Sequence, residues 1–245
     1  MPDALPYRIN FLGCPADSDV PWTREHLQWL VDHGFNMVQL NIAWGARPGD
    51  EPLNLEDVVD VTGMELRQSL PLGSDPSPEA TRRRRDNLRH RIALCREMGL
   101  RTIFHFGAPF NQHAFHGDTP PNCLMDESVR RFYRQLIERL DEQFPGIDDL
   151  LLYTYDQDAW LCSEFGDCPR CAGMPLHERI SDFVNDLARA WRGLHPQGRL
   201  WWEPWELSAG QVLASIDRLD ADCVALALHC TIAEVMATMP VDRWL

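Results

Sequence analysis

The segment Leu150–Trp160, with the sequence LLLYTYDQDAW, decides the fold predicted for this chain. It begins as an apolar run of strand length and ends with two aspartates, Asp156 and Asp158. Residues two apart in a strand point to the same face, so we expect both carboxylates to leave a buried strand side by side, with Trp160 just beyond them. An aspartate after a strand also commonly caps the next turn, and this segment alone does not separate the two roles.

Strand-like runs recur on both sides of this segment, and helical periodicity separates them. The other strands are expected at Tyr7–Leu12, Asn36–Trp44, Arg101–Pro109, Arg199–Trp205 and Asp222–Cys230. The helices are expected at Trp22–Phe35, Glu79–Met98, Asp126–Phe144, Leu176–Leu194 and Gly210–Leu219, and a further one begins at Ile232–Met239. This alternation predicts an α/β fold with a parallel sheet and right-handed crossovers.

Polar residues gather where the expected strands end, namely at Gln39, Asn41, His105, Asp156, Asp158, Glu203 and His229. An eight-fold β/α barrel places its active site at the carboxyl ends of its strands. We therefore predict one (β/α)-barrel catalytic domain of the TIM type over residues 1–245, ending after about six βα units, with a long loop insertion at 45–78. A flavodoxin-like open sheet is the alternative, although no glycine-rich phosphate turn follows the first strand.

The composition excludes several classes of function. The formal net charge is -14, which disfavours nucleic-acid and anionic-membrane partners. All 23 basic residues are arginine, which excludes Schiff-base aldolases, pyridoxal-phosphate enzymes and Walker A loops, because each needs a lysine. The N-terminus lacks signal-peptide features and no apolar run reaches about 20 residues, so we predict a cytoplasmic location without a membrane partner. The eight cysteines are then expected as thiols or metal ligands.

Aromatic and polar residues near the strand ends indicate a carbohydrate substrate. Indole faces stack on sugar rings, and neighbouring polar groups bind the hydroxyls. The expected substrate contacts are Asn41, Trp44, His105, Trp160, Trp202, Trp205, Glu206 and His229. Glycoside hydrolysis needs two carboxyl groups across the scissile bond and no cofactor. We predict Asp158 as the general acid, Glu203 as the base or nucleophile from the adjacent strand, and Asp156 as an ionised group that orients the sugar.

The segments YDQDAW after the fourth strand and WWEPWE in the fifth carry a resemblance to the (β/α)8 glycoside hydrolases, in particular the hexosaminidase-like and α-glucuronidase-like barrels. The resemblance covers most of the chain as a pattern and implies a glycosidase acting on a carbohydrate. The adjacent Asp-Glu pair typical of family 20 hexosaminidases is absent after the fourth strand. The seventh-strand nucleophile of many retaining barrel enzymes would lie in the remaining barrel units, which we expect in the full-length protein.

Two other functions fit the same strand ends. His105, Asp156, Glu203 and His229 are ligand types that a catalytic Mn²⁺ or Zn²⁺ prefers, which would indicate a metal-dependent sugar isomerase or hydrolase. In a non-catalytic sugar-binding barrel, the tryptophans would bind the sugar and the acids would only accept hydrogen bonds.

The loop at 161–173, LCSEFGDCPRCAG, contains a pattern typical of zinc sites. Cys168 and Cys171 have the spacing of a zinc knuckle, whose tight turn directs two thiolates at one metal. Cys162 is the expected third ligand, and either Cys123 or His177 the fourth. Such a zinc would be structural and would hold a loop over the active site. The alternative is a turn with free buried thiols, because one knuckle is half a site.

Overall fold

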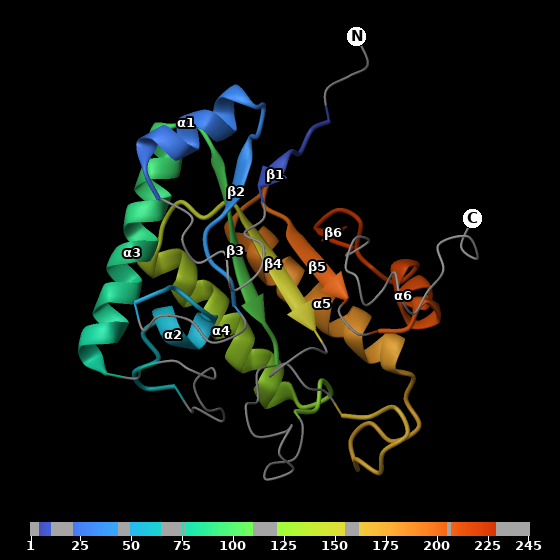
Figure 1. The fold of residues 1–245 in the computed structure, drawn as a ribbon. Coiled ribbons are helices and arrows are strands. Elements are labelled where there is room, and N and C mark those ends of the chain that lie inside the picture. The colour runs from blue at the N-terminus through green and yellow to red at the C-terminus, as the bar shows by residue number, and fades with distance from the viewer. Residues whose placement is uncertain are drawn as a thin grey trace.

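The computed structural model describes residues 5–10, 22–43, 50–64, 75, 77–109, 122–154, 162–204 and 207–228. In these ranges strands and helices alternate along the chain, except that two consecutive helices lie between the second and third strands (Figure 1). The strands are β1 (Ile9–Asn10), β2 (Met37–Gln39), β3 (Arg101–Gly107), β4 (Asp149–Thr154), β5 (Leu200–Pro204) and β6 (Val224–Leu226). The helices are α1 (Arg24–Asp32), α2 (Leu55–Val58), α3 (Pro78–Glu97), α4 (Glu127–Gln143), α5 (Leu176–Leu194) and α6 (Ala209–Ile216).

The strands form one parallel sheet in the sequential order β1-β2-β3-β4-β5-β6. A flavodoxin-like sheet would have the order 2-1-3-4-5, in which the chain reverses direction across the sheet. The sequential order is that of a β/α barrel, in which each unit is added beside the last. The structure therefore excludes the open-sheet alternative.

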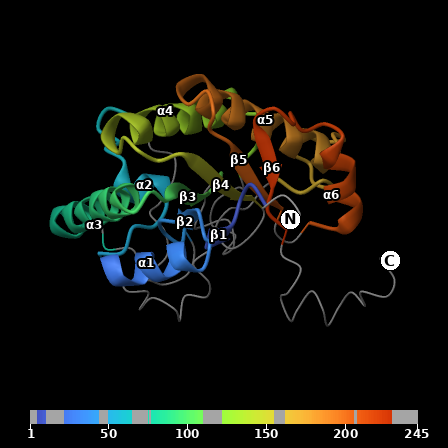
Figure 2. The same cartoon turned by 90° about the horizontal axis from the view of Figure 1, so that it is seen from above.

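The sheet curls, and the helices lie along its outer side (Figure 2). Tyr7, just before β1, packs its ring edge-on against Trp201 of β5, with 5.0 Å between ring centroids. Three strands separate β1 from β5 in the sheet order, so this contact requires strong curvature. Met37, Ile103 and Leu151 fill the concave face between them. The predicted fold class is confirmed as a curled parallel half-barrel of the TIM type.

The opposite face of each strand packs against the helices and forms the main core. Because side chains alternate across a strand, the residues flanking those of the concave face point outward. The outward-facing residues are Val38, Leu40, Phe104, Phe106, Leu150, Leu152, Leu200 and Trp202. Trp202 is 0% exposed and donates its indole N–H to Thr154 Oγ1 at 3.0 Å. The prediction that Trp202 contacts a substrate was wrong, because its strand phase directs it into the core.

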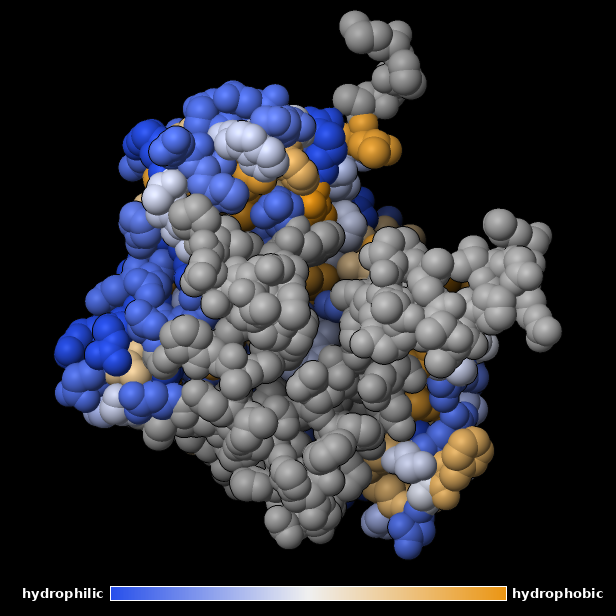
Figure 3. Space-filling model, viewed as in Figure 1, coloured by the Kyte–Doolittle hydropathy of each residue, from blue (hydrophilic) through white to orange (hydrophobic). Residues whose placement is uncertain are grey.

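Helix boundaries follow from local capping. Asp126 accepts a hydrogen bond from the backbone N–H of Ser128 and so caps α4. Gly34 and Gly99 follow α1 and α3 with positive φ angles of 84° and 70°, a backbone conformation that glycine adopts without strain. Exposed arginines along α3 make the surface over this helix hydrophilic (Figure 3).

The segment expected as a loop insertion at 45–78 contains the short helix α2 and the first residue of α3. Asn54 and Asp57 hold the start of α2, because the backbone N–H of Asn54 donates to the Asp57 carboxylate at 3.0 Å. Among the helices of the described ranges, none has the length and apolar character needed to cross a membrane.

Candidate active site and cysteine cluster

Glu203 and His105 meet on the concave face of the sheet, near the carboxyl ends of β5 and β3. Strand β4 lies between them, and Tyr153 of β4 is in register with Glu203. The His105 Nε2 atom lies 3.4 Å from Glu203 Oε2. The two residues are only 2% and 5% exposed. The sequence predicted both as site residues, and the structure brings them together.

The ring of His105 is held in one orientation by donors to its Nδ1 atom. The backbone N–H of Ala43 lies 3.3 Å and the amide nitrogen of Gln39 3.1 Å from Nδ1. The same Gln39 amide nitrogen also donates to the carbonyl of Asn41 at 2.6 Å, which fixes which end of the amide is nitrogen. Nδ1 therefore accepts, and the neutral ring carries its proton on Nε2, facing Glu203. Within the described ranges, Nε2 has no well-formed hydrogen bond.

Asn41 supports His105 instead of facing a substrate. Its Oδ1 accepts from the backbone N–H of His105 at 2.9 Å, and its Nδ2 donates to the His105 carbonyl at 2.7 Å and to the Leu53 carbonyl. Asn41 is 0% exposed, and both of its amide hydrogens are used. The prediction that Asn41 binds substrate was wrong, since its side chain continues the sheet pairing after β2 has ended at Gln39.

The side chain of Asn54 pairs with the backbone of β3 in the same way, at Gly107, two residues after His105. The sequence did not predict this role. Its Oδ1 accepts from the backbone N–H of Gly107 at 2.9 Å, and its Nδ2 donates to the Gly107 carbonyl at 3.2 Å. An asparagine before a short helix is a recognisable N-cap, but nothing in the sequence indicates that its side chain also pairs with a strand. Asn41 and Asn54 together fix the end of β3, which carries His105.

Gly107 leaves room for the ring of Tyr153, which packs against His105 with 5.3 Å between ring centroids. A Cβ atom at Gly107 would lie 2.2 Å from Tyr153 Cζ, a contact that the buried ring does not tolerate. We expect Gly107→Ala to lower the free energy of unfolding by about 1–3 kcal/mol, as overpacking does. Urea denaturation measures this loss, and Gly193→Ala is the control, because a Cβ there meets no atom within 4 Å. Equal stability of the two variants would contradict the packing described.

The comparison with known proteins is informative at the level of the fold. No protein-family model matches the chain, and no curated protein matches it in sequence. Solved structures of similar fold include glycoside hydrolases. A family GH138 enzyme targeting pectin rhamnogalacturonan II has a TM-score of 0.50 at 10% identity, and the match covers 87% of this chain and 23% of that enzyme.

Two further enzymes have lower TM-scores. A glycoside hydrolase family 5 enzyme from Prevotella bryantii B14 has a TM-score of 0.46 at 14% identity, with 89% of this chain and 56% of the enzyme covered. A family GH13_31 enzyme has 0.45 at 14% identity, with 83% and 46% covered. The chain thus spans about half or less of the length of these structures. The predicted resemblance to barrel glycoside hydrolases is confirmed for the fold.

Seven of the predicted site residues lie outside the described residues. These are Asp156, Asp158, Trp160, Trp44, Trp205, Glu206 and His229. Their roles therefore stay predictions.

A second constellation consists of four cysteines, Cys123, Cys162, Cys168 and Cys171, whose Sγ atoms all lie within 4.8 Å of one another. Cys123 precedes α4, and the other three lie between β4 and α5. All are buried except Cys168, which is half-buried. Of the two predicted fourth ligands, Cys123 belongs to this group and His177 does not.

The pKa values of the thiols in the cysteine cluster are shifted in different directions. Burial raises the pKa of Cys171 to about 11 and moves that of Cys162 upward as well. Burial also acts on Cys168, but hydrogen bonds from the backbone N–H of Arg170 and from Cys171 outweigh it and lower its pKa to about 7. Arg179, fully buried, donates from Nη1 to Cys171 Sγ at 3.3 Å.

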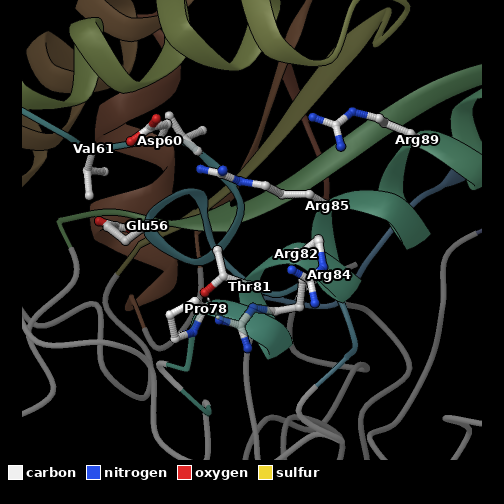
Figure 4. Close-up of a pocket in the computed structure, with 10 residues that line it drawn as sticks. Glu56, Asp60, Val61, Pro78, Thr81, Arg82, Arg84, Arg85 and Arg89 are labelled. Atoms are coloured by element: carbon white, nitrogen blue, oxygen red, sulfur yellow. Dashed lines mark hydrogen bonds between the residues drawn. The ribbon is translucent and has the colours of Figure 1, made fainter.

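A pocket of about 570 Å³ lies away from both constellations, between α2 and the first turns of α3 (Figure 4). Glu56 lines it, together with Arg82, Arg84 and Arg85. Arg85 reaches toward the end of α2, where its Nε donates to the carbonyl of Val58, the last residue of that helix, at 2.7 Å. Burial raises the pKa of Glu56 to about 8, and the nearby Asp57 adds to this, although the hydroxyl of Tyr133 donates to Glu56 Oε1 at 2.9 Å.

Proposed function

We propose that this chain forms part of the active site of a glycoside hydrolase and that Glu203 is one of its two essential carboxylates. The observation that carries the proposal is the position of Glu203 on the concave face, near the carboxyl end of β5, opposite His105 at 3.4 Å. Barrel enzymes build their active sites from this end of the strands. The fold shared with glycoside hydrolases supports the choice of reaction. Because the chain spans only part of those structures, the activity is proposed for the whole protein.

In this proposal Glu203 acts as the base or nucleophile, and Asp158 is the acid that protonates the leaving-group oxygen. The Nε2–H of His105 faces the Glu203 carboxylate across 3.4 Å, so in this proposal His105 acts on the substrate through Glu203. Asp156 stays ionised and orients the sugar. Trp44, Trp160, Trp205, Glu206 and His229 are the proposed sugar contacts, whereas Asn41 and Trp202 serve the fold.

We expect Glu203→Gln to lower kcat for glycoside hydrolysis by about 10²–10⁴-fold, because an amide of the same shape neither attacks carbon nor accepts a proton from water. The measurement is turnover of a panel of natural and aryl glycosides by the full-length protein. Glu138→Gln, the same change at an exposed position on α4, is the matched control and should leave kcat unchanged. Near-normal turnover of a natural glycoside by Glu203→Gln would remove Glu203 from the mechanism.

The same assay separates the two carboxylate roles and the other functions. An activated aryl leaving group needs little protonation, so Asp158→Asn should recover more of its cleavage rate on such substrates than Glu203→Gln. Activity abolished by a chelator and restored by Mn²⁺ would indicate the metal-dependent enzyme instead. Sugar binding without turnover on any substrate would indicate the sugar-binding barrel.

A further inference from the structure

We propose that Cys123, Cys162, Cys168 and Cys171 bind one zinc ion through four thiolates, and that this ion fastens together two loops at the active-site end of the sheet. Cys123 closes the connection from β3 to α4, and the other three cysteines belong to the connection from β4 to α5. The inference does not depend on the proposed glycosidase activity.

The positions of the sulfur atoms are close to those of a tetrahedral site. Four sulfurs at the usual Zn–S distance of about 2.3 Å lie about 3.8 Å from one another. The observed limit of 4.8 Å needs only a small contraction. The backbone N–H groups of Cys171 and Ala172 both donate to the Cys168 carbonyl, at 3.2 and 2.8 Å, which closes the knuckle turn. The backbone N–H of Cys162 donates to the Asn122 carbonyl at 3.3 Å and so joins the two connections beside the cluster.

The buried guanidinium of Arg179 is an independent indication of negative charge at this place. Arg179 is 0% exposed, and an arginine side chain keeps its charge in proteins. Its Nη1 donates to the Cys162 carbonyl at 3.1 Å and to Cys171 Sγ at 3.3 Å. In the part of the chain that the structure describes, its Nε and Nη2 atoms have no hydrogen-bond partner and no carboxylate pairs with it.

The balance of charge around the four cysteines favours a bound metal ion. An isolated charge in a protein interior is costly, so buried charges are paired. With four neutral thiols, Arg179 would have no countercharge among the described residues. Four thiolates around Zn²⁺ carry a net charge of about −2, which the arginine partly neutralises. Binding balances as Zn²⁺ and four thiols giving the tetrathiolate complex and four protons.

The donor set assigns a structural role to the ion. Four protein ligands fill the tetrahedral shell and leave no position for water or substrate, unlike catalytic zinc sites. A solvent-accessible hollow of about 720 Å³ borders Cys123, Cys162 and Cys168 and offers the ion an access route. Asp158 precedes Cys162 by four residues in the sequence, so the ion fixes the chain at Cys162, four residues after the predicted acid.

The first experiment measures zinc in the full chain, purified under reducing conditions, by mass spectrometry of the metal. We expect about one zinc per chain in the wild type and nearly none in Cys168→Ser/Cys171→Ser or in Cys123→Ser. Cys95→Ser and Cys223→Ser are the matched controls, because both residues are buried free cysteines outside the cluster, and they should keep the zinc. Loss of zinc in Cys123→Ser but not in His177→Ala identifies the fourth ligand.

The second experiment keeps the proposal testable if the cysteine variants fail to fold. Wild-type protein is treated with a strong chelator, its thermal unfolding is recorded, and zinc or Co²⁺ is then added back. We expect the Tm to fall by several degrees and recover with either metal, with Co²⁺ giving the absorption of a tetrahedral thiolate complex. Wild-type protein that contains iron instead of zinc, contains no metal, or holds Cys168 and Cys171 in a disulfide under reducing conditions would overturn the assignment.

Discussion

Replacing Glu56 with glutamine is expected to make the protein more stable than the wild type at pH 9, while at pH 4 the two should be almost equally stable. Glu56 is 6% exposed, and its Oε2 atom has no hydrogen-bond partner among the described residues. Burial of the carboxylate raises its pKa from an ordinary value of 4.5 to about 8. Glutamine has the shape of the protonated acid and can still accept from Tyr133, whose hydroxyl bonds to Oε1.

The sign of this effect follows from proton linkage. Below pH 4.5 the carboxyl group is protonated in both the folded and the unfolded chain, so acid and amide behave alike. Between pH 4.5 and 8 the unfolded chain loses this proton and the folded chain keeps it, so the stability that Glu56 contributes falls by about 1.4 kcal/mol per pH unit. Above pH 8 both states are ionised and the loss levels off. Glutamine has no proton to lose and avoids a penalty of a few kcal/mol.

Urea denaturation of both proteins across pH 4 to about 9 measures the difference. All other carboxylates are common to the two proteins, so their contributions cancel in the comparison. Glu138→Gln, at an exposed position, is the control and should follow the wild type at every pH. A constant difference between Glu56→Gln and wild type across this range would contradict the raised pKa.

Truncating Trp202 to alanine is expected to lower the free energy of unfolding by about 3–5 kcal/mol, the usual cost of deleting a large aromatic side chain from a core. Trp202 is 0% exposed, lies between β5 and the helices, and donates to Thr154. Its removal leaves a cavity and a buried hydroxyl without this donor. Trp202→Phe should recover much of the loss, because it refills most of the volume but not the hydrogen bond.

Thermal or urea unfolding gives this value, and Trp29→Ala is the matched control. Trp29 lies on α1 with 51% of its surface exposed, so its truncation should change stability by less than about 0.5 kcal/mol. A small effect of Trp202→Ala on stability, together with weaker sugar binding, would show that Trp202 contacts a substrate instead of serving the core.

The sequence predicted the order of helices and strands because the 3.6-residue period of helices and the two-residue period of strands are strong, local patterns. The helix expected at Leu176–Leu194 has those bounds in the structure, and the helix expected at Glu79–Met98 differs from α3 by one residue at each end. The predicted boundaries of the strands were less accurate than those of the helices. Strand β2 ends at Gln39, since the side chain of Asn41 then takes over pairing with β3. A side chain that pairs with a strand in place of the backbone cannot be recognised from the pattern of hydrophobic residues.

The candidate site shows the same division. The alternation of side chains along a strand places His105 and Glu203 on the concave face. The same alternation places Trp201 on the concave face and its neighbour Trp202 on the opposite face. Trp202 lies near the end of β5, as a substrate contact would, but its position in the strand directs the side chain into the core. The sequence indicated neither the 3.4 Å approach of His105 to Glu203 nor the donors that set the tautomer of His105. The approach of His105 to Glu203 depends on the curvature across β3, β4 and β5, and the donors to His105 come from β2 and the residues that follow it.

The cysteine cluster separates most clearly what the sequence determined by itself from what the tertiary structure decided. The spacing of Cys168 and Cys171 predicted that these two thiols lie close together, as the two cysteines of a zinc knuckle do. The sequence left Cys123 and His177 as equal candidates for the fourth position. The parallel pairing of β3 and β4 decided between them. It places the connections after the two strands side by side at their carboxyl ends, where Cys123 lies close to the other three sulfurs.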